Sequence, residues 1–182
     1  MYAWNRIFLF CFLPLSFLCA ACQTESKPIK KQNGVTKALE DRIPQPQGFV
    51  NDFENLYTIK EQKLLDSLLV ACETETTIQM AVVTIDTTMT TKNNLDDFTL
   101  KLANTWGIGH KNKNNGIVIG ISKGHRKMRI QNGHGTEQTL SDSETKQIVE
   151  DNFIAHFKKG EYFEGTREGI ESLFAKLRTK LK

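Results

Sequence analysis

The chain has 182 residues, of which 39% are hydrophobic and 25% charged, and its formal net charge is +3 at pH 7. This length suits one domain with a core of its own, and the composition is ordinary for a globular domain. The near balance of charge gives no sign of nucleic-acid binding, so we expect no nucleic-acid partner.

The N-terminus has the pattern of an export signal. Residues 7–21 form an uncharged apolar run that Pro14 interrupts and that is too short to span a membrane, which takes about 20 residues. The run ends in Ala20-Ala21 directly before Cys22, which resembles a bacterial lipoprotein cleavage site. We therefore predict a signal peptide over residues 1–21, acylation of Cys22, and export to the cell envelope with the lipid as membrane anchor. A cleaved soluble form and an uncleaved anchor are the alternatives.

The four cysteines follow from this prediction. Cys11 and Cys19 leave with the signal peptide, and Cys22 carries the lipid. Cys72 then has no partner for an internal disulfide. It lies on the apolar face of a predicted helix, so we expect a buried small hydrophobe rather than a reactive thiol.

Residues 22–47 begin with the acylated cysteine and continue as a polar, lysine-rich stretch that contains Pro28, Pro44 and Pro46. No apolar periodicity is visible there. We interpret this stretch as a flexible tether between the membrane and a globular domain over residues 48–182.

The first helix of that domain is predicted after Thr58, because Thr58 and Glu61 form a capping-box pattern. An apolar stripe at helical spacing follows the cap, and it comprises Leu64, Leu65, Leu68, Leu69 and Cys72. We expect Leu68, in the middle of the stripe, to be fully buried.

The later elements alternate in type. Residues 78–85 are apolar on both faces, as in a central strand covered on both sides, and a helix with Leu95 and Phe98 inward follows. Residues 116–122 and 126–132 have the pattern of a hairpin. A second capping box begins at Ser141 and opens a helix, and a last helix carries apolar residues from Phe163 onward.

This order predicts the fold class. A strand–helix–strand crossover makes the first two strands parallel, and the hairpin returns the third strand antiparallel. With helices on both faces, we expect a three-layer α/β/α sandwich with a small mixed sheet, one parallel crossover and one hairpin.

The same topology places two polar loops at one end of the sheet. Residues 106–115 precede the rising hairpin strand, and residues 133–141 follow the descending one. Candidate site residues on these loops are Asn114, Asn115 and Glu137, with Asp142 at the start of the next helix. Carboxylate and amide oxygens are the ligands that hard cations take, so we expect weak binding of Ca²⁺ or Mg²⁺ here. Asp52 is a further candidate ligand.

A family resemblance rests on short motifs spread in order along the domain. They are residues 48–52 (GFVND), 106–109 (WGIG), 114–116 (NNG), 133–137 (GHGTE), 140–142 (LSD) and 157–162 (FKKGEY) followed by Gly165. In these motifs the chain resembles the TPM domain. It differs from the family pattern at Asn114, where the family has aspartate, and at His134, where the family has tyrosine.

The resemblance implies an α/β sandwich in an exported or membrane-anchored protein. Some family members are thylakoid-lumen proteins tied to photosystem II repair, some are described as acid phosphatases, and some as calcium-binding. Two functions therefore stay open for this chain. The first is a binding or assembly module of the cell envelope, with an envelope protein as partner and calcium at most structural. The second is a metal-assisted acid phosphatase acting on phosphomonoesters.

A competing motif does not fit its context. Residues 120–124 match the G-x-S-x-G pattern around Ser122, but that elbow requires a strand that feeds a helix. Here a second strand follows, so we do not expect a hydrolase triad. The histidines also lack the spacing of a zinc site.

The anchoring prediction has a direct test. The expressed protein should lose residues 1–21 and carry acyl chains on Cys22, because the small pair before this cysteine marks the cleavage point. Cys22→Ser should abolish the acylation. Mass spectrometry that finds Met1 retained, or Cys22 unmodified, would show that the prediction is wrong.

Overall fold

The structure, a computed structural model, describes residues 43–110 and 112–181. The predicted signal peptide, the acylated Cys22 and the tether as far as residue 42 lie outside the described residues. Within the described part, none of the helices combines the length and the apolar character that crossing a membrane requires.

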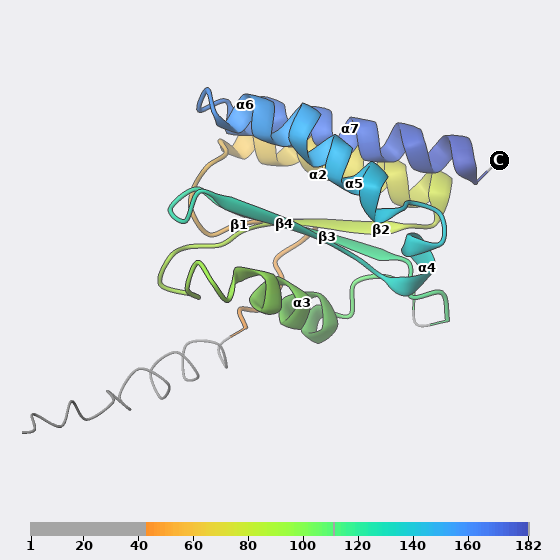
Figure 1. Cartoon of the computed structure of the whole chain (residues 1–182), viewed down its shortest axis with the longest axis horizontal. Coiled ribbons are helices and arrows are strands. Elements are labelled where there is room, and N and C mark those ends of the chain that lie inside the picture. Colours follow the sequence, from red (N-terminus) through yellow and green to blue (C-terminus); the bar gives the residue numbers. More distant parts are fainter. Residues whose placement is uncertain (1–42, 111, 182) are drawn as a thin grey trace, which may run out of the picture. The chain divides into compact units, whose positions relative to one another are not determined.

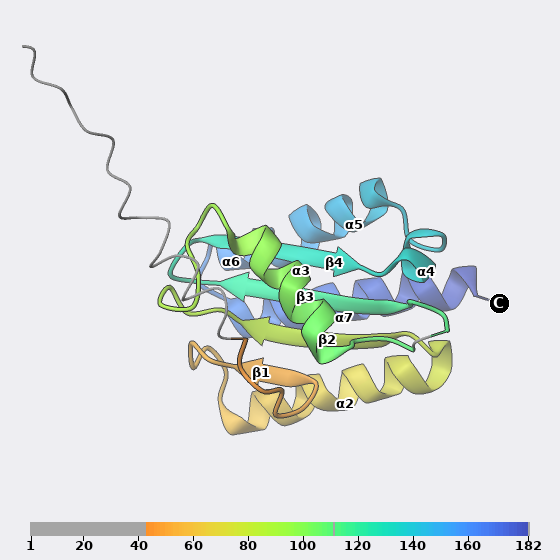
Figure 2. The same ribbon diagram turned by 90° about the horizontal axis from the view of Figure 1, so that it is seen from below.

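A four-stranded mixed sheet forms the centre of the domain (Figure 2), with the strands in sequence order. They are β1 (Val50–Asp52), β2 (Gln79–Thr84), β3 (Gly116–Ser122) and β4 (Lys127–Asn132). β1, β2 and β3 are parallel, and β4 returns antiparallel to β3. The predicted crossover and hairpin are confirmed. The structure adds β1 as an edge strand, and with it a second parallel crossover.

Helices cover both faces of this sheet (Figure 1), which confirms the three-layer sandwich. α3 lies on one face, and α2, α5 and α7 lie on the other. The helical segments are α2 (Ile59–Thr76), α3 (Leu95–Trp106), α4 (His134–Glu137), α5 (Asp142–Ile148), the π-helical η1 (Val149–Ile154), α6 (Ala155–Phe157) and α7 (Tyr162–Lys180).

Two apolar cores follow from the alternation of side chains along the strands. Ile117 and Ile119 of β3 face α2 and α7, and they belong to the larger core together with Leu173. Val118 points to the other face and packs with Phe98 of α3. Each fully buried residue of this size contributes about 1.5–3 kcal/mol relative to an exposed one. β3 is thus the strand that both layers cover.

Both predicted capping boxes are present. The Thr58 hydroxyl accepts a hydrogen bond from the backbone N–H of Glu61, while the Glu61 carboxylate accepts one from the Thr58 N–H. Ser141 and Glu144 repeat this arrangement at the start of α5. Each box satisfies two backbone donors that the helix would otherwise leave free, which fixes where α2 and α5 begin.

The buried stripe of α2 is narrower than the sequence analysis predicted. Leu65 and Leu69 are 0% exposed, but Leu64 is 48% exposed and Leu68 is only partly buried at the edge of the core. The prediction of a fully buried Leu68 was therefore wrong. α2 lies against the sheet and α7 along the line of residues 65, 69 and 72, so Leu64 and Leu68 fall on its flanks.

The packed part of the chain begins before Gly48. The Trp106 indole N–H at the end of α3 donates to the Pro44 carbonyl at 2.7 Å, and Ile43 packs against the α3 core. A buried indole usually finds such an acceptor. Residues 43–47, which the sequence analysis assigned to the tether, are thus joined to the domain through Trp106.

The burial of α2 gives a stability prediction. Leu69→Ala should lower the free energy of unfolding by about 2–5 kcal/mol, because it leaves a cavity against the sheet. Leu64→Ala is the matched control on the same helix and should change stability by less than about 0.5 kcal/mol, as exposed substitutions usually do. Denaturant unfolding of both variants measures the difference. Equal losses would mean that the buried face of α2 is assigned incorrectly.

Candidate functional site

Two loops meet at the edge of the sheet where β3 begins and β4 ends. Ile117 pairs with Asn132 at this edge, and the Gly133 N–H extends the ladder by donating to the Gly116 carbonyl at 2.8 Å. The Gly135 N–H then donates to the Asn114 carbonyl at 3.0 Å. The convergence that the topology predicted is therefore present, and we call the loops, residues 107–110 with 112–115 and residues 133–141, together with Asp142, the loop site.

Glycines make this contact between backbones possible. A Cβ atom on Gly133 would lie under 3.0 Å from the Asn114 carbonyl oxygen, and one on Gly135 would lie equally close to the Lys113 carbonyl oxygen. Real Cβ atoms do not approach carbonyl oxygens so closely, so any side chain here would separate the loops. The glycine spacing of residues 133–135 is thus a condition for the loop site.

The two neighbouring asparagines have different roles. Asn115 is buried, its Oδ1 accepts from the His110 N–H at 3.0 Å, and its Nδ2 donates to the Thr77 carbonyl at 2.5 Å. Its side chain therefore holds the loop together. Asn114 has an exposed side chain and a left-handed backbone with φ of 45°, a conformation that asparagine adopts more readily than most residues. The Asn114 side chain is available to a ligand.

Glu137 connects the two hollows of this edge. One groove of about 470 Å³ is lined by Asn114, His134 and Glu137. A second groove of about 320 Å³ is lined by Glu137, Asp142 and Lys146. The Glu137 side chain is 47% exposed, and its carboxylate lies 3.0 Å from Nδ1 of His134. The loop site thus brings Asn114, Glu137 and Asp142 to one end of the sheet.

Asp52 lies elsewhere. It pairs with Thr84 at the end of β2, which is the opposite end of the sheet from the loop site. Its Oδ1 accepts from the Thr84 hydroxyl at 2.7 Å, and its Oδ2 accepts from the Tyr57 N–H at 2.8 Å. Asp52 therefore holds the turn before α2 and does not join the other candidate ligands. The three-residue strand β1 gave no direction in the sequence, which is why its place was not predicted.

The loop site suits a cation only in part. Its donors are oxygens, as Ca²⁺ and Mg²⁺ prefer, but Ca²⁺ takes 6–8 of them. In the ranges that the structure describes, no group of three or more His, Cys, Asp or Glu side chains is placed to hold a metal ion. Lys146 beside Asp142 and His134 beside Glu137 further oppose a bound cation. Any cation would therefore be held with several water ligands.

The nucleophile candidates in the sequence are engaged in structural roles. Ser122 is buried, and its hydroxyl donates to the Ile85 carbonyl at 2.6 Å, with a second strand following the turn. Cys72 is buried as predicted, and its burial raises the pKa of the thiol to about 11, which keeps it protonated at neutral pH. Neither residue is placed to attack a substrate.

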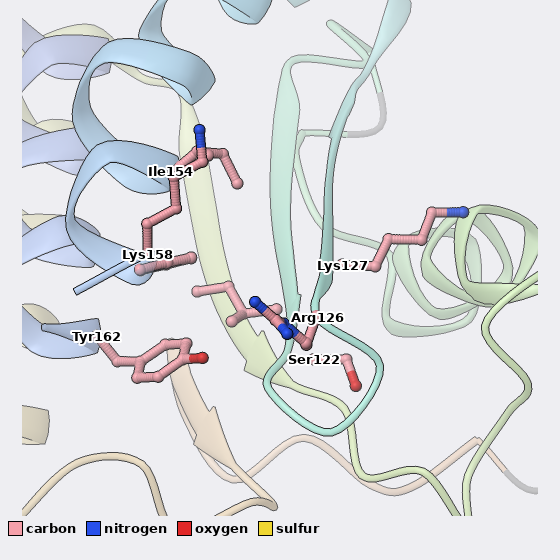
Figure 3. Close-up of a pocket in the computed structure, with 8 residues that line it drawn as sticks. Ser122, Arg126, Lys127, Ile154, Lys158 and Tyr162 are labelled. Atoms are coloured by element: carbon pink, nitrogen blue, oxygen red, sulfur yellow. The ribbon is translucent and has the colours of Figure 1, made fainter. Parts of the chain in front are cut away.

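A third hollow lies near the opposite end of the sheet, between the β3–β4 turn and the segment from η1 to α7 (Figure 3). Its lining includes Arg126, Lys158 and Tyr162, which sequence reasoning did not join. These residues come from separate elements, and only the packing of α7 beside the sheet brings them together. The sequence contains one local sign of this hollow. In the turn after β3, Arg126 occupies a left-handed position where glycine or asparagine is usual.

Comparison with known proteins gives a family match and related structures. A family model described as the TPM domain matches residues 50–176. The NMR structure of the N-terminal domain of a protein from P. gingivalis is 32% identical with a TM-score of 0.66, and the match covers 73% of this chain and 83% of that one. No curated protein matches the sequence.

Two more distant NMR structures show the same fold. The BA42 protein from the psychrophilic bacterium Bizionia argentinensis is 19% identical with a TM-score of 0.62, with coverage of 71% of this chain and 86% of that one. An N-terminal domain from Corynebacterium glutamicum is 12% identical with a TM-score of 0.55, with coverage of 75% and 87%.

The loop contact gives a prediction of its own. Gly135→Ala should destabilise the protein by about 1–3 kcal/mol, because the added methyl group meets the backbone of Lys113, which cannot move aside as a flexible side chain can. Gly48→Ala is the control, since nothing lies within 4 Å of its added Cβ. Denaturant unfolding gives the stability, and amide NMR shifts at residues 112–116 report the loop. A neutral Gly135→Ala would contradict the contact.

Proposed function

The chain belongs to the TPM domain family, and we propose that it is a binding or assembly module of the cell envelope, held at a membrane by acylated Cys22. Its loop site would bind a divalent cation weakly. The sequence before the domain supports export and anchoring, since a short apolar run ends at Ala20-Ala21-Cys22. The partner would be another protein of the envelope.

One observation carries the cation proposal. Glu137 borders both grooves of the loop site, so its carboxylate is shared between the Asn114 side and the Asp142 side. The close contact of Gly133 and Gly135 with the backbone of residues 113–114 fixes the distance between the two loops before any ligand binds. A site whose frame is formed in advance loses less entropy on binding. An ion between these oxygens would join the two loops more firmly.

The expected affinity is low. The site offers two carboxylates and one amide oxygen as ligands. Such a small set suggests the affinity of extracellular calcium-binding modules, whose dissociation constants are about 10⁻⁴–10⁻³ M. His134 holds the Glu137 carboxylate at 3.0 Å, so a cation would have to share or displace that contact. A site of this affinity fills and empties as the calcium concentration changes in the millimolar range. Bound calcium would then stabilise the two loops without taking part in a reaction.

Metal-assisted phosphatase activity is the alternative that the family resemblance raises. That reaction needs an ion to polarise the phosphoryl oxygen and to activate water. The same three side chains, Asn114, Glu137 and Asp142, would have to hold that ion. Two positively charged side chains, Arg129 and Lys146, line the groove beside Glu137 and Asp142. We rank binding above catalysis because the lining of the two grooves offers only two carboxylates to hold the ion, and Lys146 lines the same groove as Asp142.

A calcium titration tests the proposal. In the Cys22→Ser chain, which carries no lipid, amide NMR shifts should change at residues 112–116 and 133–142 with a dissociation constant of about 10⁻⁴–10⁻³ M. Glu137→Gln should weaken binding because it removes a charge, and Asn114→Asp should tighten it because it adds one. Glu150→Gln, an exposed change of the same kind on η1, should have no effect.

Two results would reject the cation site. In the first, shifts appear only outside residues 112–116 and 133–142. In the second, Glu137→Gln and Glu150→Gln give the same titration as the parent chain. Release of phosphate from a chromogenic ester that needs metal and stops with a chelator would favour the phosphatase instead.

A further inference from the structure

The hollow between the β3–β4 turn and the α6–α7 corner has a volume of about 180 Å³. We call it the hairpin cavity. It is far from the loop site, because the hairpin turns at the end of the sheet opposite to Gly133. Its size is below the roughly 300–1,000 Å³ of pockets for drug-sized ligands, so it fits a small molecule or one end of a larger molecule.

One side of the hairpin cavity is apolar. Ile121, Ile154, Phe157 and the ring of Tyr162 line it. The rings of Phe157 and Tyr162 lie against each other with centroids 4.9 Å apart. This aromatic pair forms a firm wall that can take up an aliphatic or aromatic group. In Figure 3 the Tyr162 hydroxyl points toward the side of the cavity from which Arg126 comes.

Two cations also line the cavity. Arg126 comes from the hairpin turn and Lys158 from the helix side beside Ile154, as Figure 3 shows, and neither forms an ion pair with a carboxylate among the described residues. The Lys123 ammonium lies 5.6 Å from the centre of the Tyr162 ring. Lys127 differs from them, since it pairs with Asp96 at 3.0 Å. Two free positive charges thus border an apolar wall.

Acidic groups on the segments that border the cavity have partners of their own. The Glu54 carboxylate accepts from the backbone N–H of Lys123 at 2.8 Å and of Gly124 at 3.0 Å. Glu161 and Glu168 lie on either side of the His156 ring, at 2.8 Å and 3.0 Å, and these contacts raise the pKa of His156. The lining itself contains no acidic residue. The charge of Arg126 and Lys158 is therefore left for an external anion.

Two irregular backbone segments border the same cavity. Arg126 has a φ of 52° in the left-handed region, a conformation that is unfavourable for a residue with a Cβ atom. η1 is a π-helical segment, a rare conformation that occurs often at functional sites, and its last residue Ile154 lines the cavity. The fold thus keeps a strained cation and a distorted helix facing one hollow, as ligand sites often do.

We propose that the hairpin cavity binds a small organic anion with a carboxylate head and an apolar body. The Arg126 guanidinium takes the carboxylate in the bidentate geometry that suits it, and the Lys158 ammonium adds positive charge. The Tyr162 hydroxyl serves as a further donor. The apolar body packs against Ile154 and Phe157. Two other classes of ligand fit less well. An inorganic anion would leave the apolar wall exposed to water, and an uncharged molecule would leave both cations without a counter-charge.

The test uses three probes on the Cys22→Ser chain, followed by amide NMR. Hexanoate should give saturable shifts at residues 121–127 and 154–162, with a dissociation constant on the order of 1 mM for so small a ligand. Hexanol lacks the charge, and acetate lacks the apolar chain. Each should bind at least about tenfold more weakly than hexanoate, since hexanol cannot form the charge-assisted hydrogen bonds and acetate cannot pack against the apolar wall.

Three variants locate the binding. Arg126→Asn removes the charge and keeps a residue that tolerates the left-handed backbone, and it should weaken hexanoate about tenfold. Lys158→Gln should weaken it less, by about threefold to tenfold, and it leaves the turn untouched, so it decides the matter if Arg126→Asn disturbs folding. Lys159→Gln is the control, because Lys159 is the exposed neighbour that does not line the cavity.

Several outcomes would overturn the proposal. Acetate binding as tightly as hexanoate would indicate a simple anion site, and hexanol binding as tightly would indicate an apolar patch. An equal loss of hexanoate affinity in Lys158→Gln and Lys159→Gln would mean that the anion is attracted by the overall positive charge of this surface and not by the cavity. An absence of saturable shifts would mean that the hairpin cavity is not a carboxylate site. Calcium plays no part in these measurements, so the result is independent of the loop site.

Discussion

The burial of β3 on both faces is the constraint on which the rest of the structure depends. Every residue of this strand is buried, so both of its faces must be covered by other elements. Ile117, Ile119 and Ile121 require α2 and α7 on one side, and Val118 requires α3 on the other. At Gly120 the cover is especially close, since a Cβ there would meet the Thr99 side chain of α3. A strand of this kind cannot lie at an edge, so β2 and β4 flank it.

The two candidate sites are the two ends of this one strand. The loop site forms where β3 begins, because the hairpin returns the chain to Gly133 beside Gly116. The hairpin cavity forms where β3 ends, because the turn after Ser122 meets the corner before α7. Their linings differ in charge, because Glu137 and Asp142 lie with Arg129 and Lys146 at the first end, whereas the second end has cationic side chains and no acidic one. The strand thus separates a groove of mixed charge from a cationic cavity by its own length.

The second end also depends on the close packing of α7. A Cβ at Gly169 would overlap the ring of Phe153, and one at Gly165 would meet His156 and Phe157. These two glycines let α7 lie directly on η1 and α6, which sets the position of Tyr162 relative to the hairpin. The glycine that follows the motif at residues 157–162 therefore has a packing role in the same region as the cavity. A larger residue at either position would move the cavity wall.

Local chemistry determined much of this protein from the sequence alone. The capping boxes at Thr58 and Ser141, the apolar run of β3 and the alternation of Met128 and Ile130 fixed the element types, the layers and the meeting of the two loops. These features act within a few residues or follow from chain direction, so a sequence displays them. Only the tertiary structure decided the rest. It placed Asp52 at the opposite end of the sheet from the loop site, and it showed that the Asn115 side chain holds its loop together while the Asn114 side chain is exposed. It also brought Arg126 and Lys158 to one cavity. Each of these depends on which distant backbone lies beside a residue, and periodicity carries no information about that.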